Sequence, residues 1–294
     1  MEKTKKSLKV GKKEDKIDKD TNKDKDTNKD KEIDLNIYPV KVDKKRLNEG
    51  VSKYPLSNST HLHLICGRVK AGKSTLLNSL YMSKRFFAKD FKVKILISTT
   101  AHNDAVNKYM IEDFDFVFDT YSDALMDEIL HMIETDEETG KYLIIFDDII
   151  GSINFKRTGK VDKISELVSH YRHIGNEKQE GRIAIAIASQ YFKYFNGILR
   201  TNCSGYYILG EFPESEVKKM AEDLSYFGGG KKEFMEIFKK SRQNPHDFLY
   251  LSVEHLEARR NHTDLLWSKD KGIIGESDVI AEDDKIDDLD ANSE

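Results

Sequence analysis

The sequence predicts an α/β fold with a mostly parallel central sheet flanked by helices. Three observations support this class. A glycine-rich loop at residues 67–74 lies between an apolar strand and a helix. A second apolar strand, at residues 142–146, ends in two carboxylates. Further apolar strands alternate with helical segments along the chain, which is typical of parallel sheets buried on both faces.

Composition sets the broad class. The 294 residues suffice for one large α/β domain and leave room for a second small unit. Charged residues make up 34% of the chain but the formal net charge is only −4, so any basic surface is local. Two cysteines, Cys66 and Cys203, are too few for a set of disulfides. With no apolar run long enough to cross a bilayer and no signal peptide, we expect a soluble, intracellular protein without membrane insertion.

The chain divides into four segments by composition. Residues 1–36 are almost wholly charged and polar, so we expect a disordered tail, with a nucleic-acid-binding arm as the alternative. Residues 37–59 form an approach segment with two X-Pro turns. We expect the main domain at residues 60–255. Residues 256–294 form a C-terminal segment, and we expect its acidic end, residues 276–294, to be a disordered tail.

Residues 67–74, GRVKAGKS, fit the phosphate-loop pattern G-x-x-x-x-G-K-[ST] without a mismatch. Glycines let backbone N–H groups close around phosphate, Lys73 supplies charge for the β- and γ-phosphates, and the Ser74 hydroxyl suits Mg²⁺. A glycine-rich turn without a ligand is the alternative. The expected nucleotide-binding residues are Gly67, Arg68, Val69, Lys70, Ala71, Gly72, Lys73, Ser74 and Thr75.

The strand that ends in Asp147 and Asp148 fits the Walker B arrangement. An apolar central strand brings its terminal carboxylate beside the phosphate loop, so we expect Asp147 and Ser74 to hold Mg²⁺. Asp148 is the candidate for polarising the attacking water. The alternative for Asp147 is a helix cap or a turn carboxylate, and that for Asp148 is a cap for the turn at residues 149–151.

The remaining elements of the first half follow from spacing. The phosphate-loop helix ends near residue 84, and residues 92–99 alternate and then run apolar, as a buried strand does. A helical stretch runs through residues 109–112 before a short aromatic strand at 114–118. Residues 122–134 carry an apolar helical face.

The second half repeats the alternation. We expect a helix at residues 162–173 and then a strand at 182–188 that stops at Ser189-Gln190. Gln190 occupies a sensor position, where a side-chain amide can contact the γ-phosphate and move when it leaves. The alternative is a glutamine that simply ends the strand. The elements expected after it are a helix at 191–202, a strand at 205–210, helices at 213–224 and 233–241, and a strand at 247–253.

The order of these elements selects a class of P-loop NTPase. Two expected strands, at 92–99 and 114–118, separate the phosphate loop from the Walker B strand. This insertion is typical of the ASCE type, which includes translocases, helicases and recombination ATPases, and it argues against GTPases and nucleotide kinases. No LSGGQ-type signature precedes Walker B, which argues against an ABC transporter subunit.

Several motifs together resemble one family. They are residues 65–74, LIIFDD at 143–148, residues 171–173, the strand ending in Ser189-Gln190, residues 198–202, and HDFLYL at 246–251. In this order they resemble the genome-packaging ATPases of large DNA viruses and virophages, in the FtsK/HerA superfamily of DNA pumps. The resemblance covers about residues 55–255.

The resemblance implies an ATPase that uses ATP and Mg²⁺ to drive double-stranded DNA into a preformed capsid at the host-cell site of virion assembly. It implies a homo-oligomeric ring and a viral capsid or vertex protein as partners. In such a ring an arginine of a neighbouring subunit stabilises the transferring phosphoryl group. Arg172 and Arg200 are the candidates, Arg200 being favoured, and an ordinary surface role is the alternative for each. Asp148 stands where cellular DNA pumps usually have Glu.

The sequence offers candidates for DNA contacts and allows two other functions. Lysines and arginines on loops would grip phosphate without reading bases. The leading candidates are Lys156, Arg157 and Lys160, followed by Lys231 and Lys232, with a solvated surface as the alternative for each. The other functions are a helicase or recombination ATPase, and a nucleotide-binding capsid-vertex protein that does not hydrolyse ATP.

Overall fold

The computed structural model describes residues 53–101, 111–149, 162–176 and 179–274. The chain forms two units, residues 1–41 and 42–294, and all described residues belong to the second. The expected tails at 1–36 and 276–294, and most of the approach segment, lie outside the described residues. No helix within the described ranges combines the length and apolar character needed to span a bilayer.

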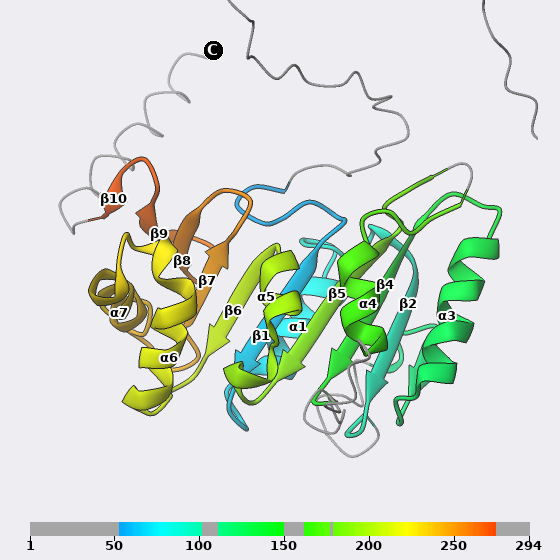
Figure 1. Ribbon diagram of the computed structural model, residues 1–294, viewed down its shortest axis with the longest axis horizontal. Coiled ribbons are helices and arrows are strands. Elements are labelled where there is room, and N and C mark those ends of the chain that lie inside the picture. Colours follow the sequence, from blue (N-terminus) through cyan, green and yellow to red (C-terminus); the bar gives the residue numbers. More distant parts are fainter. Residues whose placement is uncertain (1–52, 102–110, 150–161, 177–178, 275–294) are drawn as a thin grey trace, which may run out of the picture. The chain divides into compact units, whose positions relative to one another are not determined.

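The described strands form one sheet in the order β10-β9-β8-β7-β6-β1-β5-β4-β2-β3 (Figure 1). Neighbours from β6 to β3 pair in parallel, and those from β6 to β10 pair antiparallel. The expected α/β class with a mostly parallel central sheet is therefore confirmed. The strands are β1 Leu62–Gly67, β2 Phe91–Ser98, β3 Phe116–Phe118, β4 Lys141–Asp147, β5 Ile183–Ser189, β6 Gly205–Leu209, β7 Phe248–Ser252, β8 Glu257–Arg260, β9 Asp264–Ser268 and β10 Gly272–Ile273.

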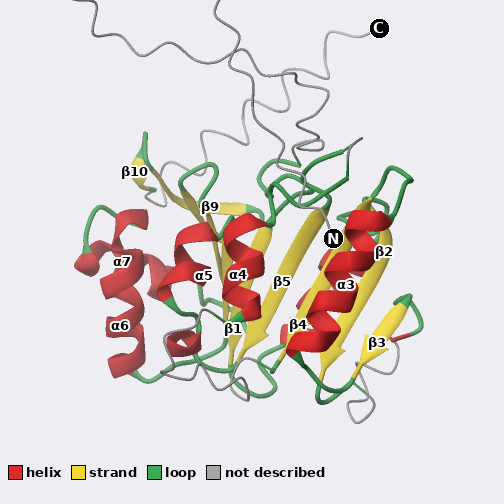
Figure 2. Ribbon diagram, turned by 45° about the vertical axis from the view of Figure 1, so that its right-hand side comes forward, coloured by secondary structure: helices red, strands yellow, loops and turns green. Residues whose placement is uncertain are grey.

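Helices cover both faces of the sheet. Helices α3, α4, α5, α6 and α7 lie on one face and α1 on the other (Figures 1 and 2). Alternate residues of β1 enter the two cores, with Leu64 facing the larger group of helices and Ile65 facing α1. The helices are α1 Lys73–Met82, α3 Asp123–Thr135, α4 Lys163–His170, α5 Gly197–Asn202, α6 Glu214–Leu224 and α7 Lys231–Lys240.

Most expected elements within the described ranges occur within two or three residues of their predicted bounds. The helix expected at 191–202 is wrong as a continuous element. A 3₁₀ turn at Phe192–Tyr194 comes first, and α5 begins only at Gly197. Asn196 ends the irregular stretch because its side chain accepts a hydrogen bond from Leu199 N, 3.0 Å away, which caps the new helix. The first two residues of the helical stretch expected at 109–112 lie outside the described residues.

The sheet continues past residue 255, where we expected the main domain to end. Strands β8, β9 and β10 extend it to Ile273 as an antiparallel meander. Trp267 on β9 is 7% exposed and packs edge-on against Phe227. These strands therefore share the core of the domain.

Candidate functional site

The phosphate loop connects the end of β1 to the start of α1. Its backbone turns tightly, with Ala71 N donating to Arg68 O at 3.1 Å. Gly72 has φ 96°, a conformation that favours glycine, and Lys70 adopts φ 64°. A Cβ atom on Gly67 would lie 3.1 Å from Leu209 Cβ, so the first glycine also permits close packing against β6. The loop thus has the sharp, glycine-dependent path that the motif predicts.

Lys73 is the first residue of α1 and is 8% exposed. Its ammonium donates to Gly67 O at 2.9 Å and lies 3.8 Å from Asp148 Oδ2. The lysine therefore crosses from the helix back over the loop toward the end of β4. This position gives it access to phosphate held by the amino end of α1.

Asp147 is the last residue of β4 and is 2% exposed. The hydroxyl of Ser98, at the end of β2, donates to Asp147 Oδ2 at 3.3 Å. A carboxylate and the Ser74 hydroxyl are hard oxygen donors of the kind Mg²⁺ takes alongside phosphate and water. Within the described ranges, no group of three or more His, Cys, Asp or Glu residues could form a metal site made by the protein alone. The donor set fits a metal that arrives with a nucleotide.

Asp148 adopts φ 53°, and its N–H donates to Ala188 O of β5 at 3.1 Å. This left-handed residue turns the chain at the end of β4. Its Oδ2 accepts a hydrogen bond from Gln190 Nε2 at 3.3 Å. Because β5 lies between β1 and β4, Gln190 arrives between the phosphate loop and the Walker B carboxylates. The structure thus brings Lys73, Asp148 and Gln190 together.

The contact of Ser98 with Asp147 was not predicted from the sequence. A buried serine at the end of a strand is common, and only its alignment with Asp147 across the β2–β4 pair gives it a role. The sequence feature that could have indicated this contact is Ser98-Thr99-Thr100, which comes at the end of an apolar strand and therefore at the same edge of the sheet as Asp147.

Neither candidate arginine contacts the phosphate loop of its own chain. Arg200 on α5 forms an ion pair with Asp223 of α6, with 2.7 Å between Nη1 and Oδ2, and its guanidinium lies over the ring of Phe192. A trans role would require Arg200 to leave or share Asp223.

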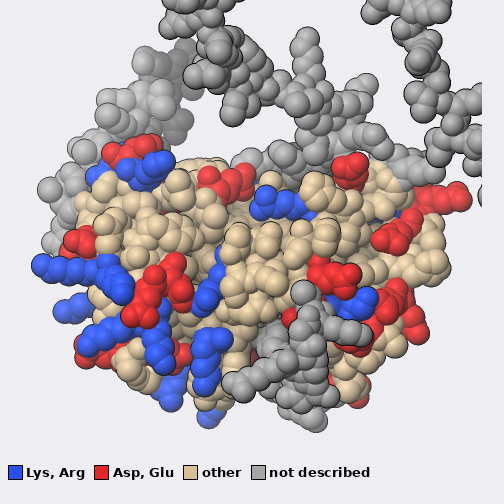
Figure 3. Space-filling model, viewed as in Figure 1, with Lys and Arg blue, Asp and Glu red and all other residues tan. Residues whose placement is uncertain are grey.

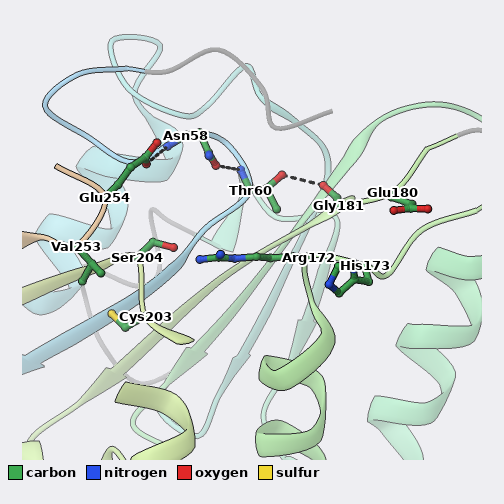
Figure 4. Close-up of a pocket in the computed structure, with 10 residues that line it drawn as sticks. All are labelled: Asn58, Thr60, Arg172, His173, Glu180, Gly181, Cys203, Ser204, Val253 and Glu254. Atoms are coloured by element: carbon green, nitrogen blue, oxygen red, sulfur yellow. Dashed lines mark hydrogen bonds between the residues drawn. The ribbon is translucent and has the colours of Figure 1, made fainter. Parts of the chain in front are cut away.

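Arg172 lies at the opposite edge of the sheet. It follows α4, and its Nε donates to Tyr171 OH at 3.0 Å. Its side chain extends across a pocket of about 590 Å³ that opens near the amino ends of β1, β5 and β6 (Figure 4). The pocket is lined by Asn58, Thr60, Arg172, His173, Glu180, Gly181, Cys203, Ser204, Val253 and Glu254. This pocket is separate from the phosphate loop, which lies at the carboxyl ends of the same strands.

The expected DNA-contacting residues are only partly described. Lys156, Arg157 and Lys160 lie outside the described residues. Lys231 and Lys232 are exposed at the start of α7, where Lys231 Nζ lies 3.5 Å from Glu222 Oε1. Basic and acidic side chains intermingle over the region of α6 and α7 (Figure 3). This surface is therefore not uniformly basic.

Comparison with solved structures shows a likeness of fold. The genome packaging NTPase B204 from Sulfolobus turreted icosahedral virus 2, in complex with AMP, matches 68% of this chain and 96% of its own at 16% identity, with a TM-score of 0.51. B204 from Sulfolobus turreted icosahedral virus, at 17% identity, and the pCW3 conjugation coupling protein TcpA, at 16%, both give a TM-score of 0.48, too low to support an argument. The match to the second B204 spans 68% of this chain and 96% of the B204 chain. The match to TcpA spans 82% of this chain and 73% of the TcpA chain.

No protein-family model matches the sequence, and a search of curated proteins found no match. The site is built on β1, β4 and β5, and the strand order β6-β1-β5-β4-β2 places one strand between the phosphate loop and Walker B, as the ASCE type requires. The resemblance expected from the motifs is thereby confirmed at the level of fold. The chain has the α/β fold of a P-loop ATPase, the fold of a viral genome-packaging NTPase.

Proposed function

We propose that this chain is an ATPase that pumps double-stranded DNA and packages a viral genome into a preformed capsid. The observation that carries the proposal is the meeting of Lys73, Asp148 and Gln190 at the carboxyl edge of the sheet. These groups come from three elements, α1, β4 and β5, and a role in packing alone would not require a cation, a carboxylate and an amide at the mouth of a phosphate loop.

Each residue has a chemical task in ATP hydrolysis. Backbone N–H groups of the phosphate loop and Lys73 hold the β- and γ-phosphates. Ser74 and Asp147 would hold Mg²⁺, which neutralises phosphate charge when bound. Asp148 orients the water whose oxygen attacks the γ-phosphorus, and the bond to the ADP oxygen breaks. Gln190, hydrogen-bonded to Asp148, couples loss of the γ-phosphate to the end of β5.

Support for DNA pumping comes from the fold and the motif order. A genome packaging NTPase shares the fold, and the chain carries the ASCE strand order used by translocases. In the proposed assembly, copies of the chain form a ring at a capsid vertex and an arginine, Arg200 or Arg172, completes the site of the next subunit. DNA is held through its phosphates by basic side chains that face the ring channel.

The proposal is tested by measuring Mg²⁺-dependent ATP hydrolysis with and without double-stranded DNA. We expect DNA to stimulate the rate. Lys73→Ala removes the phosphate-binding cation and should lower the rate by about a hundredfold or more. Asp148→Asn keeps the shape but loses the carboxylate charge, and a loss of about a hundredfold is expected. Lys84→Ala, at an exposed lysine beyond the end of α1, is the matched control and should retain full activity.

Two results would contradict the proposal. Nucleotide binding without hydrolysis by the wild type, with or without double-stranded DNA, would favour a nucleotide-binding protein at the capsid vertex. Stimulation by single-stranded DNA alone, with strand unwinding, would favour a helicase or recombination ATPase.

A further inference from the structure

The loop at residues 241–247 joins α7 to β7 at the same edge of the sheet as the phosphate loop. Strand β7 is antiparallel to β6, and Phe248 at its start pairs with Leu209 at the end of β6. Leu209 also pairs with Gly67, the first residue of the phosphate loop. The pairing therefore brings the loop before β7 next to the phosphate loop.

His246, in this loop, lies close to the phosphate loop. A Cβ atom on Gly72 would lie 4.0 Å from His246 Nδ1, so the imidazole stands at van der Waals distance from that position. The end of β6 closes in beside it, because a Cβ atom on Gly210 would lie only 2.9 Å from Ala71 Cβ. His246 is nevertheless exposed. Its ring is thus next to the phosphate loop and still accessible from solvent.

The loop is held in place by Asp247. Its Oδ2 accepts hydrogen bonds from the backbone N–H groups of Gln243 and Asn244 at 3.2 and 2.8 Å. Its Oδ1 accepts from Asn261 Nδ2 at 3.0 Å, which ties the loop to the turn between β8 and β9. His246 itself has φ 73°, a conformation that a non-glycine residue adopts only when its surroundings impose it. The imidazole is therefore presented by a fixed loop.

The direction of a bound nucleotide follows from the strand order. Asp148 and Gln190, which serve the terminal phosphate, follow β4 and β5, on the side of β1 away from β6. A triphosphate whose terminal phosphate lies there, and which extends from it across the phosphate loop, would have its nucleoside on the β6 and β7 side. That is the side on which His246 lies.

We propose that the imidazole of His246 stacks on the base of the bound nucleoside triphosphate. This inference rests on the proposed function, since it places a nucleotide in the same phosphate loop. A stacking contact is tolerant of base identity because every base has a π-face. The contact therefore distinguishes nucleotides from bare polyphosphate and does not choose among bases.

The test compares Mg²⁺-ATP with Mg²⁺-tripolyphosphate by isothermal titration calorimetry. His246→Asn removes the ring but keeps a residue that tolerates positive φ. We expect this variant to bind ATP about tenfold more weakly and tripolyphosphate with unchanged affinity. His246→Phe restores a stacking ring but is strained at φ 73°, so it should recover part of the ATP affinity that His246→Asn loses. His131→Asn, at an exposed histidine of α3, is the control and should bind both ligands normally.

The outcomes separate this inference from the proposed function. Equal weakening of ATP and tripolyphosphate in His246→Asn would assign the histidine to phosphate and overturn the inference. Unchanged ATP affinity in that variant would overturn it as well. In both cases nucleotide binding by the wild type leaves the proposed function intact, whereas a wild type that binds neither ligand contradicts the proposed function itself.

Discussion

Arg182 has no exposed side-chain surface and holds the turn between α3 and β4. Its guanidinium donates to the carbonyls of Ile133, Asp136, Glu138 and Gly140 at 2.7–3.0 Å, and to Asp136 Oδ2 at 2.8 Å. Hydrogen bonds from Tyr142 and Lys92, with that from Arg182, hold the pKa of Asp136 well below its usual value. One buried guanidinium therefore supplies hydrogen-bond donors to four carbonyls at the end of α3 and in the turn that follows it, just before the Walker B strand.

Replacing Arg182 tests this role. Arg182→Ala leaves buried carbonyls and a carboxylate without their donor, so the free energy of unfolding should fall by about 3–5 kcal/mol. Arg182→Lys keeps the charge but cannot reach all the acceptors, and its loss should be intermediate. Lys92→Ala removes a solvent-facing partner of the same Asp136 and should have a much smaller effect. Urea denaturation gives the free energy of unfolding of the three variants and so ranks their losses. A loss for Lys92→Ala as large as that for Arg182→Ala would refute the role of Arg182.

At the scale of elements, β1 and α1 form a unit that is joined at both ends. The phosphate loop connects the end of β1 to the start of α1. At the other end, Tyr81 OH lies 3.1 Å from His61 Nε2 and 2.8 Å from His63 Nδ1. His61 Nδ1 donates to Asn58 O at 2.7 Å, and the two imidazoles stack with centroids 3.8 Å apart. These polar rings are fully buried but have hydrogen-bond partners.

This histidine pair predicts a loss of stability in mild acid. Burial lowers the pKa of His61 from 6.5 to about 3 and that of His63 well below 6.5. The folded state keeps His61 neutral while the unfolded chain binds a proton below pH 6.5, so stability is full above that pH and falls as the pH drops toward 3. At pH 5 the cost from His61 alone is about 2 kcal/mol relative to pH 7.

The measurement is the free energy of unfolding of the wild type and of His61→Phe between pH 5 and pH 7. The variant loses hydrogen bonds at every pH, but its stability should depend less steeply on pH because one titrating group is gone. His131→Gln, at an exposed histidine, should keep the wild-type slope. Parallel curves for the wild type and His61→Phe would show that His61 does not carry the acid sensitivity.

At the scale of the whole molecule, β8 to β10 complete the sheet and its core. Truncation after residue 255 would strip the partner of β7 and remove Trp267 from its contact with Phe227. We expect this truncated chain to lose cooperative thermal unfolding. Trp267→Ala should lower stability by about 3–5 kcal/mol, and truncation after residue 274 should leave the melting curve unchanged. A cooperative transition at the wild-type temperature after truncation at 255 would contradict this role.

The sequence allowed prediction of the parallel half of the fold but not of the β8 to β10 meander. Apolar periodicity identifies strands such as β4 and β5 because both of their faces are buried. In β8, however, Glu257 and Arg259 are nearly buried as an ion pair, with 2.9 Å between Arg259 Nε and Glu257 Oε2, and Tyr54 bonds to both. A strand whose buried positions carry charged residues lacks the apolar alternation by which strands are predicted from sequence.

The residues of the candidate site also fall into those that the sequence predicted and those that it could not predict. Lys73, Asp148 and Gln190 could be named from sequence because each directly follows an apolar strand or the phosphate-loop glycine, and parallel strands end at one edge. Ser98 and His246 could not, since their relevance depends on which strands are neighbours in space. The trans roles of Arg172 and Arg200 and the DNA contacts remain predictions, because they concern surfaces that face other molecules.

The closed unit of β1 and α1 has a mechanical consequence. A strand and a helix fastened to each other at both ends cannot hinge apart, so they act as a strut. A displacement of the phosphate loop would then be transmitted along this unit to the surface around Asn58, where His61 is anchored. If the chain works as the proposed DNA pump, that edge is where movement of the phosphate loop would reach a neighbouring molecule.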